Sequence, residues 1–362
     1  MANTDDKPAL KITLEDLAKV EVRGEALTGA MAPAAAGERQ YGTIAPTGAE
    51  PAASTAEKPS IFLQGWFYLG LAGLLGAVLG WGIMEPFIHD GSMRNLRSAL
   101  PLLLVVPSVL IFMCLGLSIA ESIVERSLRK ALLRGALSLP LGLVFAVVFL
   151  FLGGEVYQIG QEVCAYMGID IRTIDAYRNP ALWIARGLAW MVFAAAAGIV
   201  YGLVDRSVKK GRYGVIGAVI GGGIGGVLFD PISMVAHSAG PSRGIGFGLI
   251  GLAAGVAIGI VESALKDRWL YVAAGPLAGK QFILYKPITT IGSSQKCDIY
   301  LFKDNSILPE HGVIELRGAQ TFLRSNGPVF ISGQPARMRA LESGDLVQIG
   351  RYAFHFRERH RS

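Results

Sequence analysis

Six stretches of the chain contain no Asp, Glu, Lys or Arg, and this pattern limits the possible folds more than any other feature. Each stretch reaches the length of roughly 17–25 mostly apolar residues that an α-helix needs to cross a bilayer. They are residues 61–84, 98–120, 135–154, 187–204, 213–229 and 244–261. The sequence therefore predicts an all-α polytopic membrane bundle of about six helices, with five or seven spans as the alternatives.

Charge and composition divide the chain into three parts. Residues 1–60 carry a net charge of −3 and are rich in Ala, Pro, Thr and Gly, which predicts a disordered tail with one short amphipathic helix at residues 12–20. Residues 61–265 carry +3 and hold the six apolar stretches. Residues 266–362 carry +6 and have the composition of a soluble domain. We therefore expect a tail, a transmembrane domain and a C-terminal soluble domain.

Basic residues are concentrated at one end of the predicted bundle. The loops that follow the second, fourth and sixth spans hold ten Lys and Arg residues, whereas the loops on the opposite side hold five. Loops rich in Lys and Arg stay in the cytoplasm, because moving them across the membrane is disfavoured. The sequence thus predicts a multi-pass protein of the cell inner (plasma) membrane with both termini in the cytoplasm.

Two loops on this basic side resemble each other. Residues 124–130 read Val-Glu-Arg-Ser-Leu-Arg-Lys, and residues 204–210 read Val-Asp-Arg-Ser-Val-Lys-Lys. A fainter copy lies at residues 261–266. The echo is typical of duplicated helix hairpins, but loops selected for positive charge can also converge on such sequences.

Glycines recur at every fourth residue in three of the spans. Such spacing places them on one helical face, where the missing side chains let two helix backbones approach. We expect these faces to pack helices within the bundle or between protomers of a homo-oligomer, with a pore lining as the alternative. The three sets are Gly76 and Gly80; Gly217, Gly221 and Gly225; and Gly251, Gly255 and Gly259.

Ionisable residues within the spans are few, which argues against a transport pathway. Asp230 and Arg186 lie near the predicted outer interface and are close enough along their spans to pair. Glu85 and Glu262 lie at span ends, where we expect them to be solvated. Residues 155–182 form a longer outer segment with scattered apolar positions, a pattern compatible with a location on the membrane surface.

The C-terminal part changes to short alternating strands separated by turns. Many short strands within about 90 residues predict an all-β sandwich. The expected strands are residues 270–274, 281–285, 299–302, 312–316, 321–324, 329–331, 346–349 and 353–357.

Five sequence pieces in this part resemble a forkhead-associated (FHA) domain and follow the order of that family. Cys-Asp-Ile-Tyr-Leu at 297–301 is similar to its Cys/Asn-Asp-Ile-x-Leu strand, and the segment at 341–350 is similar to its closing Leu-x-x-Gly-Asp motif. The pieces are residues 275–282, 290–294, 297–301, 304–314 and 341–350. The resemblance covers about a quarter of the chain, and on it the whole protein resembles a bacterial-type polytopic membrane protein with a C-terminal FHA domain.

This resemblance implies binding of a protein partner phosphorylated on threonine, through loops at one end of the sandwich. Ser293 stands where the family has its phosphate-binding Arg, and Leu308 stands where it has Ser. A dianionic phosphate needs convergent guanidinium and hydroxyl donors, so these two replacements argue against ordinary phosphothreonine binding. Lys296, Lys303 or Arg324 could supply substitute charge, and the resemblance gives His311 a loop-bracing role. The candidate partner-binding residues are Ser293, Ser294, Lys303, His311, Arg324, Asn326 and Ser332.

The sequence favours a membrane-anchored interaction adaptor that presents its FHA-like domain at the cytoplasmic face, in Ser/Thr-kinase signalling. A channel or transporter regulated by that domain is the alternative. We expect no enzyme, no cofactor and no metal site, because no nucleophile–base pair, ligand spacing or P-loop occurs; Gly275-x-x-x-Gly279-Lys280 is one residue short of a Walker A motif. The expected partners are a protein and the lipid bilayer, with no nucleic acid.

Overall fold

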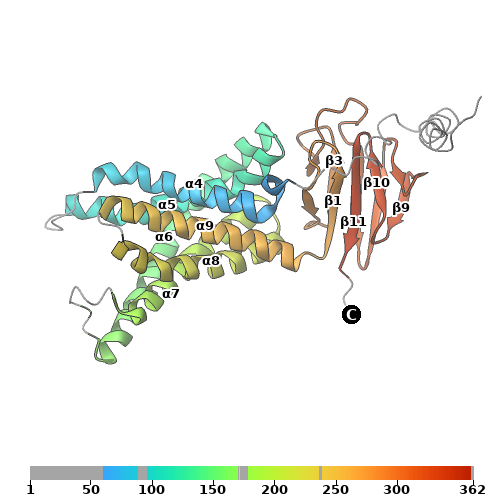
Figure 1. Ribbon diagram of the computed structural model, residues 1–362. Coiled ribbons are helices and arrows are strands. Elements are labelled where there is room, and N and C mark those ends of the chain that lie inside the picture. Colours follow the sequence, from blue (N-terminus) through green and yellow to red (C-terminus); the bar gives the residue numbers. More distant parts are fainter. Residues whose placement is uncertain (1–59, 89–95, 170, 172–177, 236–238, 360–362) are drawn as a thin grey trace, which may run out of the picture.

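The computed structural model describes residues 60–88, 96–169, 171, 178–235 and 239–359. It consists of a bundle of long helices followed by a β-sandwich that lies against one end of the bundle (Figure 1). This layout confirms the fold class expected from the sequence. The short helix expected at residues 12–20 lies outside the described residues.

Six described helices are long and apolar enough to cross a membrane. They are α4 (Gly65–Met84), α5 (Leu96–Val124), α6 (Leu128–Tyr166), α7 (Pro180–Val204), α8 (Val208–Val235) and α9 (Ala239–Leu265), with the short 3₁₀ helices η1 (Ile61–Leu63) and η2 (Glu85–Phe87) flanking α4. Most extend beyond the uncharged stretches, because charged residues with long apolar stems continue a helix into the interface.

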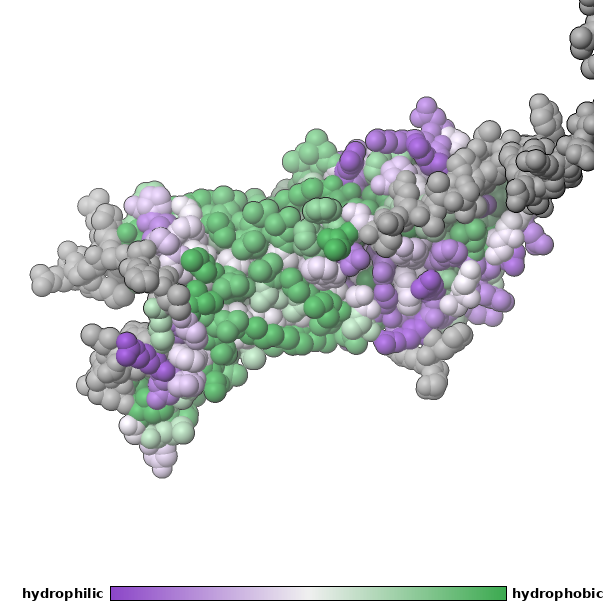
Figure 2. All heavy atoms as spheres, viewed as in Figure 1, coloured by the Kyte–Doolittle hydropathy of each residue, from purple (hydrophilic) through white to green (hydrophobic). Residues whose placement is uncertain are grey.

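The helices form a ring. Each packs against the next one along the chain, and α9 also packs against α4. Figure 2 shows hydrophobic side chains over the body of the bundle and hydrophilic ones gathered on the sandwich and at the opposite end. Large apolar side chains such as Phe151, 69% exposed, and Leu143, 53% exposed, point outward from the bundle. This apolar exterior fits a bundle surrounded by lipid.

The repeated glycines hold this ring together within one chain. The set that begins at Gly217 faces α9, the set that begins at Gly251 faces α4, and Gly76 and Gly80 face α5. A Cβ at any of these positions would overlap backbone atoms of the neighbouring helix. Since contacts within the bundle occupy these faces, the idea of a homo-oligomer formed through them loses its structural basis.

The two similar loops have the same backbone geometry. Arg126 and Arg206 have φ values of 53° and 52°, and the amides of Ser127 and Ser207 bond to carbonyl oxygens five residues back at 2.9 and 3.0 Å. Both turns are therefore Schellman motifs with Arg in the left-handed position where Gly is usual. In both, the acid before the Arg forms an ion pair with the lysine five residues later.

The end of the bundle away from the sandwich differs in part from the expectation. Helix α6 continues through residues 155–166, so this part of the segment is not an independent surface element. The Arg186 guanidinium pairs with the Asp230 carboxylate, as the sequence predicted, and its Nη2 also donates to the Tyr157 hydroxyl at 3.0 Å. Glu85 was expected to be solvated, but it is 2.7 Å from the Arg243 guanidinium.

The sandwich contains two sheets with a shared apolar core. The six-stranded sheet has the order β2-β1-β11-β10-β7-β8, and the five-stranded sheet has the order β4-β3-β5-β6-β9, in which only the β3–β4 pairing among those described is parallel. The strands are β1 (Arg268–Ala274), β2 (Gln281–Ile283), β3 (Ile288–Gly292), β4 (Ile299–Tyr300), β5 (Gly312–Arg317), β6 (Gln320–Ser325), β7 (Phe330–Ile331), β8 (Gln334–Pro335), β9 (Met338–Leu341), β10 (Leu346–Ile349) and β11 (Tyr352–Glu358). The sequence missed β3, β8 and β9; β8 and the first three residues of β9 are exposed and therefore lack the alternation that marks a strand.

We expect Gly80→Ala to destabilise the bundle by about 1–3 kcal/mol, since overpacked helices must move apart. A Cβ on Gly80 would lie 2.6 Å from the Val109 Cα of α5. Gly82, on the same helix, has no atom within 4 Å of that position, so Gly82→Ala is the matched control. Thermal unfolding of the full chain in detergent, followed by tryptophan fluorescence, measures both; equal melting temperatures for the two variants would contradict the packing role of Gly80.

Candidate functional site

The candidate site is formed by three loops at one end of the sandwich: residues 293–298 between β3 and β4, residues 301–311 between β4 and β5, and residues 326–329 between β6 and β7. Main-chain hydrogen bonds join them. The Ser293 amide donates to the Leu308 carbonyl at 2.9 Å, and the Asn326 amide donates to the His311 carbonyl at 2.8 Å. The three loops therefore form one hydrogen-bonded unit.

His311 lies at the centre of this unit and is 1% exposed. Its Nδ1 accepts a hydrogen bond from the Leu308 amide at 3.1 Å, and its Nε2 is 3.0 Å from the Pro328 carbonyl oxygen. A carbonyl only accepts, so the ring is neutral with its proton on Nε2. Burial lowers the pKa of His311 below its ordinary value. Gly327 packs against the ring face so closely that a Cβ there would overlap it.

The hydroxyls of Ser293 and Ser294 are used within the loops. Ser293 Oγ donates to the Ile307 carbonyl at 2.8 Å, and Ser294 Oγ accepts from the Lys296 amide at 3.3 Å. Among the described residues, no Lys or Arg side chain forms a hydrogen bond or ion pair with Ser293, Ser294 or Leu308. The loops therefore show no convergent cation where the family places its phosphate-binding Arg.

Asn326 belongs to the same loop cluster. Its Nδ2 donates to the Glu310 carbonyl at 3.2 Å, while its own amide is held by His311. Hydrogen bonds thus connect four of the sequence-predicted site residues through one cluster of loops: Ser293, Ser294, His311 and Asn326.

The remaining three predicted site residues have other contacts. Ser332 Oγ donates to the Asp345 carboxylate at 3.0 Å in the turn between β7 and β8. Arg324 is on β6, 59% exposed, with its guanidinium 3.9 Å from the Glu315 carboxylate of β5. Lys303 is exposed and has a φ of 61°. In the part of the chain that the structure describes, no hydrogen bond or ion pair joins these three side chains to the Ser293 loop.

A buried ion pair joins the sandwich to the helix bundle. The Lys280 ammonium lies 2.8 Å from the Glu125 carboxylate, and the two side chains are 1% and 2% exposed. The Lys280 ammonium also lies 4.6 Å from the centre of the Phe282 ring. Charges this deeply buried are tolerated only when they are paired, because each has lost its hydration.

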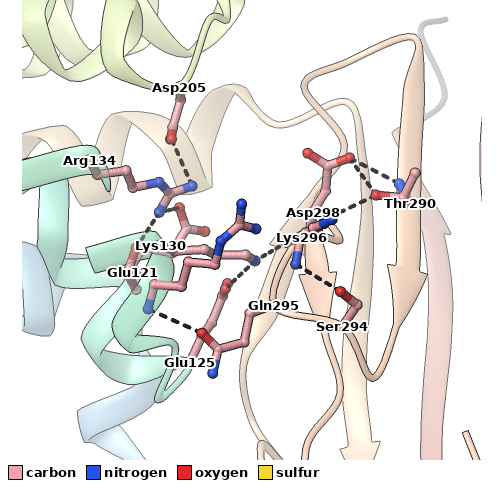
Figure 3. Close-up of polar contacts among 12 residues, drawn as sticks. Glu121, Glu125, Lys130, Arg134, Asp205, Thr290, Ser294, Gln295, Lys296 and Asp298 are labelled. Atoms are coloured by element: carbon pink, nitrogen blue, oxygen red, sulfur yellow. Dashed lines mark hydrogen bonds and ion pairs between the residues drawn. The ribbon is translucent and has the colours of Figure 1, made fainter. Parts of the chain in front are cut away.

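The turn between α5 and α6 contacts the loop that carries Ser293 and Ser294 (Figure 3). Lys130 pairs with Glu125 at 3.0 Å and donates to the Asp298 carbonyl at 2.7 Å. The Arg129 amide donates to Gln295 Oε1 at 3.1 Å. The end of the bundle therefore supports one of the three candidate partner-binding loops directly.

Beneath this turn, a network of ion pairs connects several helices. Arg134 of α6 lies 2.7 Å from Asp205, and Lys210 of α8 lies 2.8 Å from Glu121 of α5. Lys210 pairs with Asp205 as well. These residues and the facing residues of the sandwich enclose a small polar cavity of about 70 Å³.

A second contact lies where α9 leads into β1. Lys209 pairs with Asp267 at 2.6 Å, and the Tyr213 hydroxyl donates to the Leu265 carbonyl at 2.8 Å. Burial raises the pKa of Tyr285, whose ring packs on that of Tyr213. Glu262 is 5% exposed, so the expectation that it is solvated was wrong. Residues 263–265, which end α9, are exposed, so Glu262 lies on the face of α9 that is turned into the protein.

Sequence reasoning missed Glu125 and Lys280 as partners. Glu125 stood out as the acid in the repeated loop, and Lys280 stood out in the near-Walker run. Neither pattern signals that residues 155 positions apart meet, because a single sequence contains no information on pairing across domains.

Metal-ligating side chains and cysteine thiols do not form a reactive cluster in the described part of the chain. Among the described residues, no group of three or more His, Cys, Asp or Glu side chains is arranged to hold a metal ion. The three cysteines are free and buried.

The sequence model of the FHA domain family matches residues 289–350. The C-terminal module is thus an FHA domain, as the resemblance predicted. Its strands and the candidate loops together account for nearly all of the matched residues.

Curated relatives and solved structures match about a quarter of the chain. Glycogen accumulation regulator GarA of Mycolicibacterium smegmatis is 31% identical over 90 residues, which are 24% of this chain and 56% of the relative. Oxoglutarate dehydrogenase inhibitor of Corynebacterium diphtheriae is 32% identical over 92 residues, 25% of this chain and 64% of the relative. The chain therefore spans less than two thirds of each relative's length. The FHA domain of CT664 protein from Chlamydia trachomatis is 24% identical, with a TM-score of 0.25, and covers 26% of this chain and 100% of that one.

We expect the sandwich to lose stability as the pH falls from 7 to 5. The pKa of His311 in the folded protein lies below the unfolded value of about 6.5, so the unfolded chain takes up the proton first. The contribution of neutral His311 is then fully present above about pH 6.5 and is lost toward its folded pKa. Calorimetry of the full chain in detergent should show a smaller loss for His311→Asn; identical pH profiles would refute this assignment.

Lys280→Met should destabilise the protein near the lower end of the roughly 3–5 kcal/mol expected for breaking a buried pair, because Glu125 keeps Lys130. The double variant Lys280→Met/Glu125→Gln should lose less stability than the sum of the two single variants, because the two side chains form one buried pair and Lys130 keeps the Asp298 carbonyl. Arg317→Met removes an ion pair whose Arg is 57% exposed and is the control, with an expected loss below about 1 kcal/mol. Equal melting temperatures for Lys280→Met and Arg317→Met would contradict the junction.

Proposed function

We propose that this protein is a membrane-anchored interaction adaptor that holds its FHA domain at the cytoplasmic face and recruits a protein partner in Ser/Thr-kinase signalling. One observation carries the proposal: the loop at residues 293–298 rests on the α5–α6 turn through Lys130, Arg129 and their partners. A recognition domain that is fixed in this way can concentrate its partner at the membrane. Two relatives named as a regulator and an inhibitor agree with an action through binding.

The partner contacts the loop cluster around His311 with little dependence on phosphate. The hydroxyls of Ser293 and Ser294 are engaged within the loops, and Leu308 offers none. Each charge-assisted bond to a phosphate is worth about 1.5–3 kcal/mol, so losing the Arg alone weakens phosphate binding about tenfold or more. Shape and backbone contacts of the loops then carry most of the affinity.

The bundle anchors and orients the FHA domain in the inner membrane, with both termini in the cytoplasm. This orientation rests on the excess of Lys and Arg in the loops at the FHA end. In this proposal residues 1–60 form a tail, residues 61–265 form the anchor and residues 266–362 form the binding module. The protein acts by binding and has no enzymatic activity.

The channel or transporter alternative gains no support from the described residues. Asp230, 2% exposed and placed within α8, is paired with Arg186. The glycine faces that could line a pore are filled by neighbouring helices. We therefore keep the adaptor as the single proposal.

Passing peptide libraries over the full chain in lipid nanodiscs tests the adaptor proposal. We expect retention of specific peptides at similar levels whether or not their threonine is phosphorylated. The double variant Ser293→Arg/Leu308→Ser restores both family donors and should prefer phosphorylated peptides by about tenfold or more. Ser343→Ala, at an exposed turn of the sandwich, is the control.

Two results would count against the proposal. No retention of any peptide would overturn the adaptor function. A strong preference of the unaltered protein for phosphothreonine would overturn the phosphate-independent mode and leave the adaptor function intact.

A further inference from the structure

A large open groove lies between α7 and α8, at the end of the bundle that carries the FHA domain. It has a volume of about 750 Å³ and is lined mainly by apolar side chains, including Ile199 and Leu203 of α7 and Val215 and Ile216 of α8. Leu203 and Ile216 are 46% and 45% exposed, so the groove opens to the outside of the bundle. A membrane protein presents such a surface to acyl chains.

Two arginines, Arg206 and Arg212, lie along this groove. Both are exposed, and the structure records no hydrogen bond or ion pair of either side chain with any described residue. The lysines between these two arginines in the sequence, Lys209 and Lys210, are both paired with carboxylates. Two cations at the end of an apolar groove therefore lack the carboxylate partners that adjacent lysines have.

The two similar turns, α5–α6 and α7–α8, place an arginine in the same position but in different surroundings. Arg126 occupies the same left-handed position between α5 and α6 as Arg206 does between α7 and α8. The Arg126 guanidinium lies 5.8 Å from the centre of the Phe302 ring, so this exposed arginine has a contact with the FHA domain. No ring of the described sandwich forms such a contact with Arg206. Identical local geometry thus gives one arginine a protein contact and leaves the other open beside the groove.

We propose that the groove between α7 and α8 binds an anionic phospholipid, with its phosphate held between Arg206 and Arg212 and an acyl chain along Leu203 and Ile216. Guanidinium groups bind phosphate oxygens in pairs and are less strongly hydrated than ammonium groups. Arginines next to apolar grooves at the end of a bundle lie at the depth of the lipid headgroups. Charge complementarity favours a lipid of net negative charge over a zwitterionic one.

Native mass spectrometry of the full chain in detergent tests this site, with phosphatidylglycerol and phosphatidylcholine titrated separately. We expect tight retention of phosphatidylglycerol, weaker retention of phosphatidylcholine, and a loss of phosphatidylglycerol affinity of about tenfold or more in Arg206→Gln/Arg212→Gln. Arg129→Gln is the matched control, because it removes an exposed cation from the other turn and should retain the lipid. Melting temperatures of all variants confirm that they are folded.

Three outcomes would overturn the proposal. Unchanged phosphatidylglycerol binding in the double variant would show that these arginines do not hold the headgroup. Equal retention of the two lipids by the unaltered protein would show that net negative charge is not recognised. Displacement of phosphatidylglycerol by inorganic phosphate at equal concentration would show an anion site in which the groove plays no part.

Discussion

The buried ion pair between Glu125 and Lys280 is the interaction on which the arrangement of the two domains depends. Neither side chain has access to water, so each is stable in this position only when the other domain supplies its counter-charge. Two backbone turns position the side chains of Glu125 and Lys280. The Schellman turn places Glu125 at the end of α5, and Gly275 and Gly279, with φ values of 109° and 92°, shape the loop that carries Lys280. The near-Walker sequence is therefore a docking loop.

The same contact between the bundle and the sandwich also supports the candidate partner-binding loops. The α5–α6 turn that carries Glu125 also holds the loop after β3 through Lys130. Leu308 links that loop to His311, because its carbonyl accepts from the Ser293 amide and its own amide donates to His311 Nδ1. The His311 carbonyl in turn accepts from the Asn326 amide. Hydrogen bonds thus connect the helix bundle to the candidate partner-binding loops, and a partner bound there would contact a surface whose position the bundle fixes.

Much of the fold could be predicted from the sequence, because its signals are local. Uncharged stretches marked the six helices, and alternation with glycine turns marked most strands. The helix ends were less accurate: α6 runs twelve residues past Gly154, and Cys164 alone is buried among residues 155–166, so this extension has no continuous apolar signal. Strand β9 was missed because three of its four residues are exposed. Exposed edge strands carry little hydrophobic signal.

The candidate site was predicted less completely than the fold. The order of the FHA motifs located Ser293, His311 and Asn326 in one cluster of loops, but the use of the Ser293 hydroxyl within the loop depends on tertiary geometry. The junction could not be predicted, because Glu125 and Lys280 meet only after both domains have folded. The burial of Glu262 likewise depends on tertiary packing, which its place at the end of a span does not reveal.

Distance measurement by pulsed electron paramagnetic resonance tests the central claim, that the FHA domain has one fixed position on the bundle. Spin labels would be placed at Leu128, 69% exposed on α6, and at Met338, 54% exposed on β9, in a chain whose three cysteines are replaced. The account predicts a single narrow distance distribution in lipid nanodiscs, which Lys280→Met broadens. A broad distribution in the otherwise unaltered chain, unchanged by Lys280→Met, would contradict it.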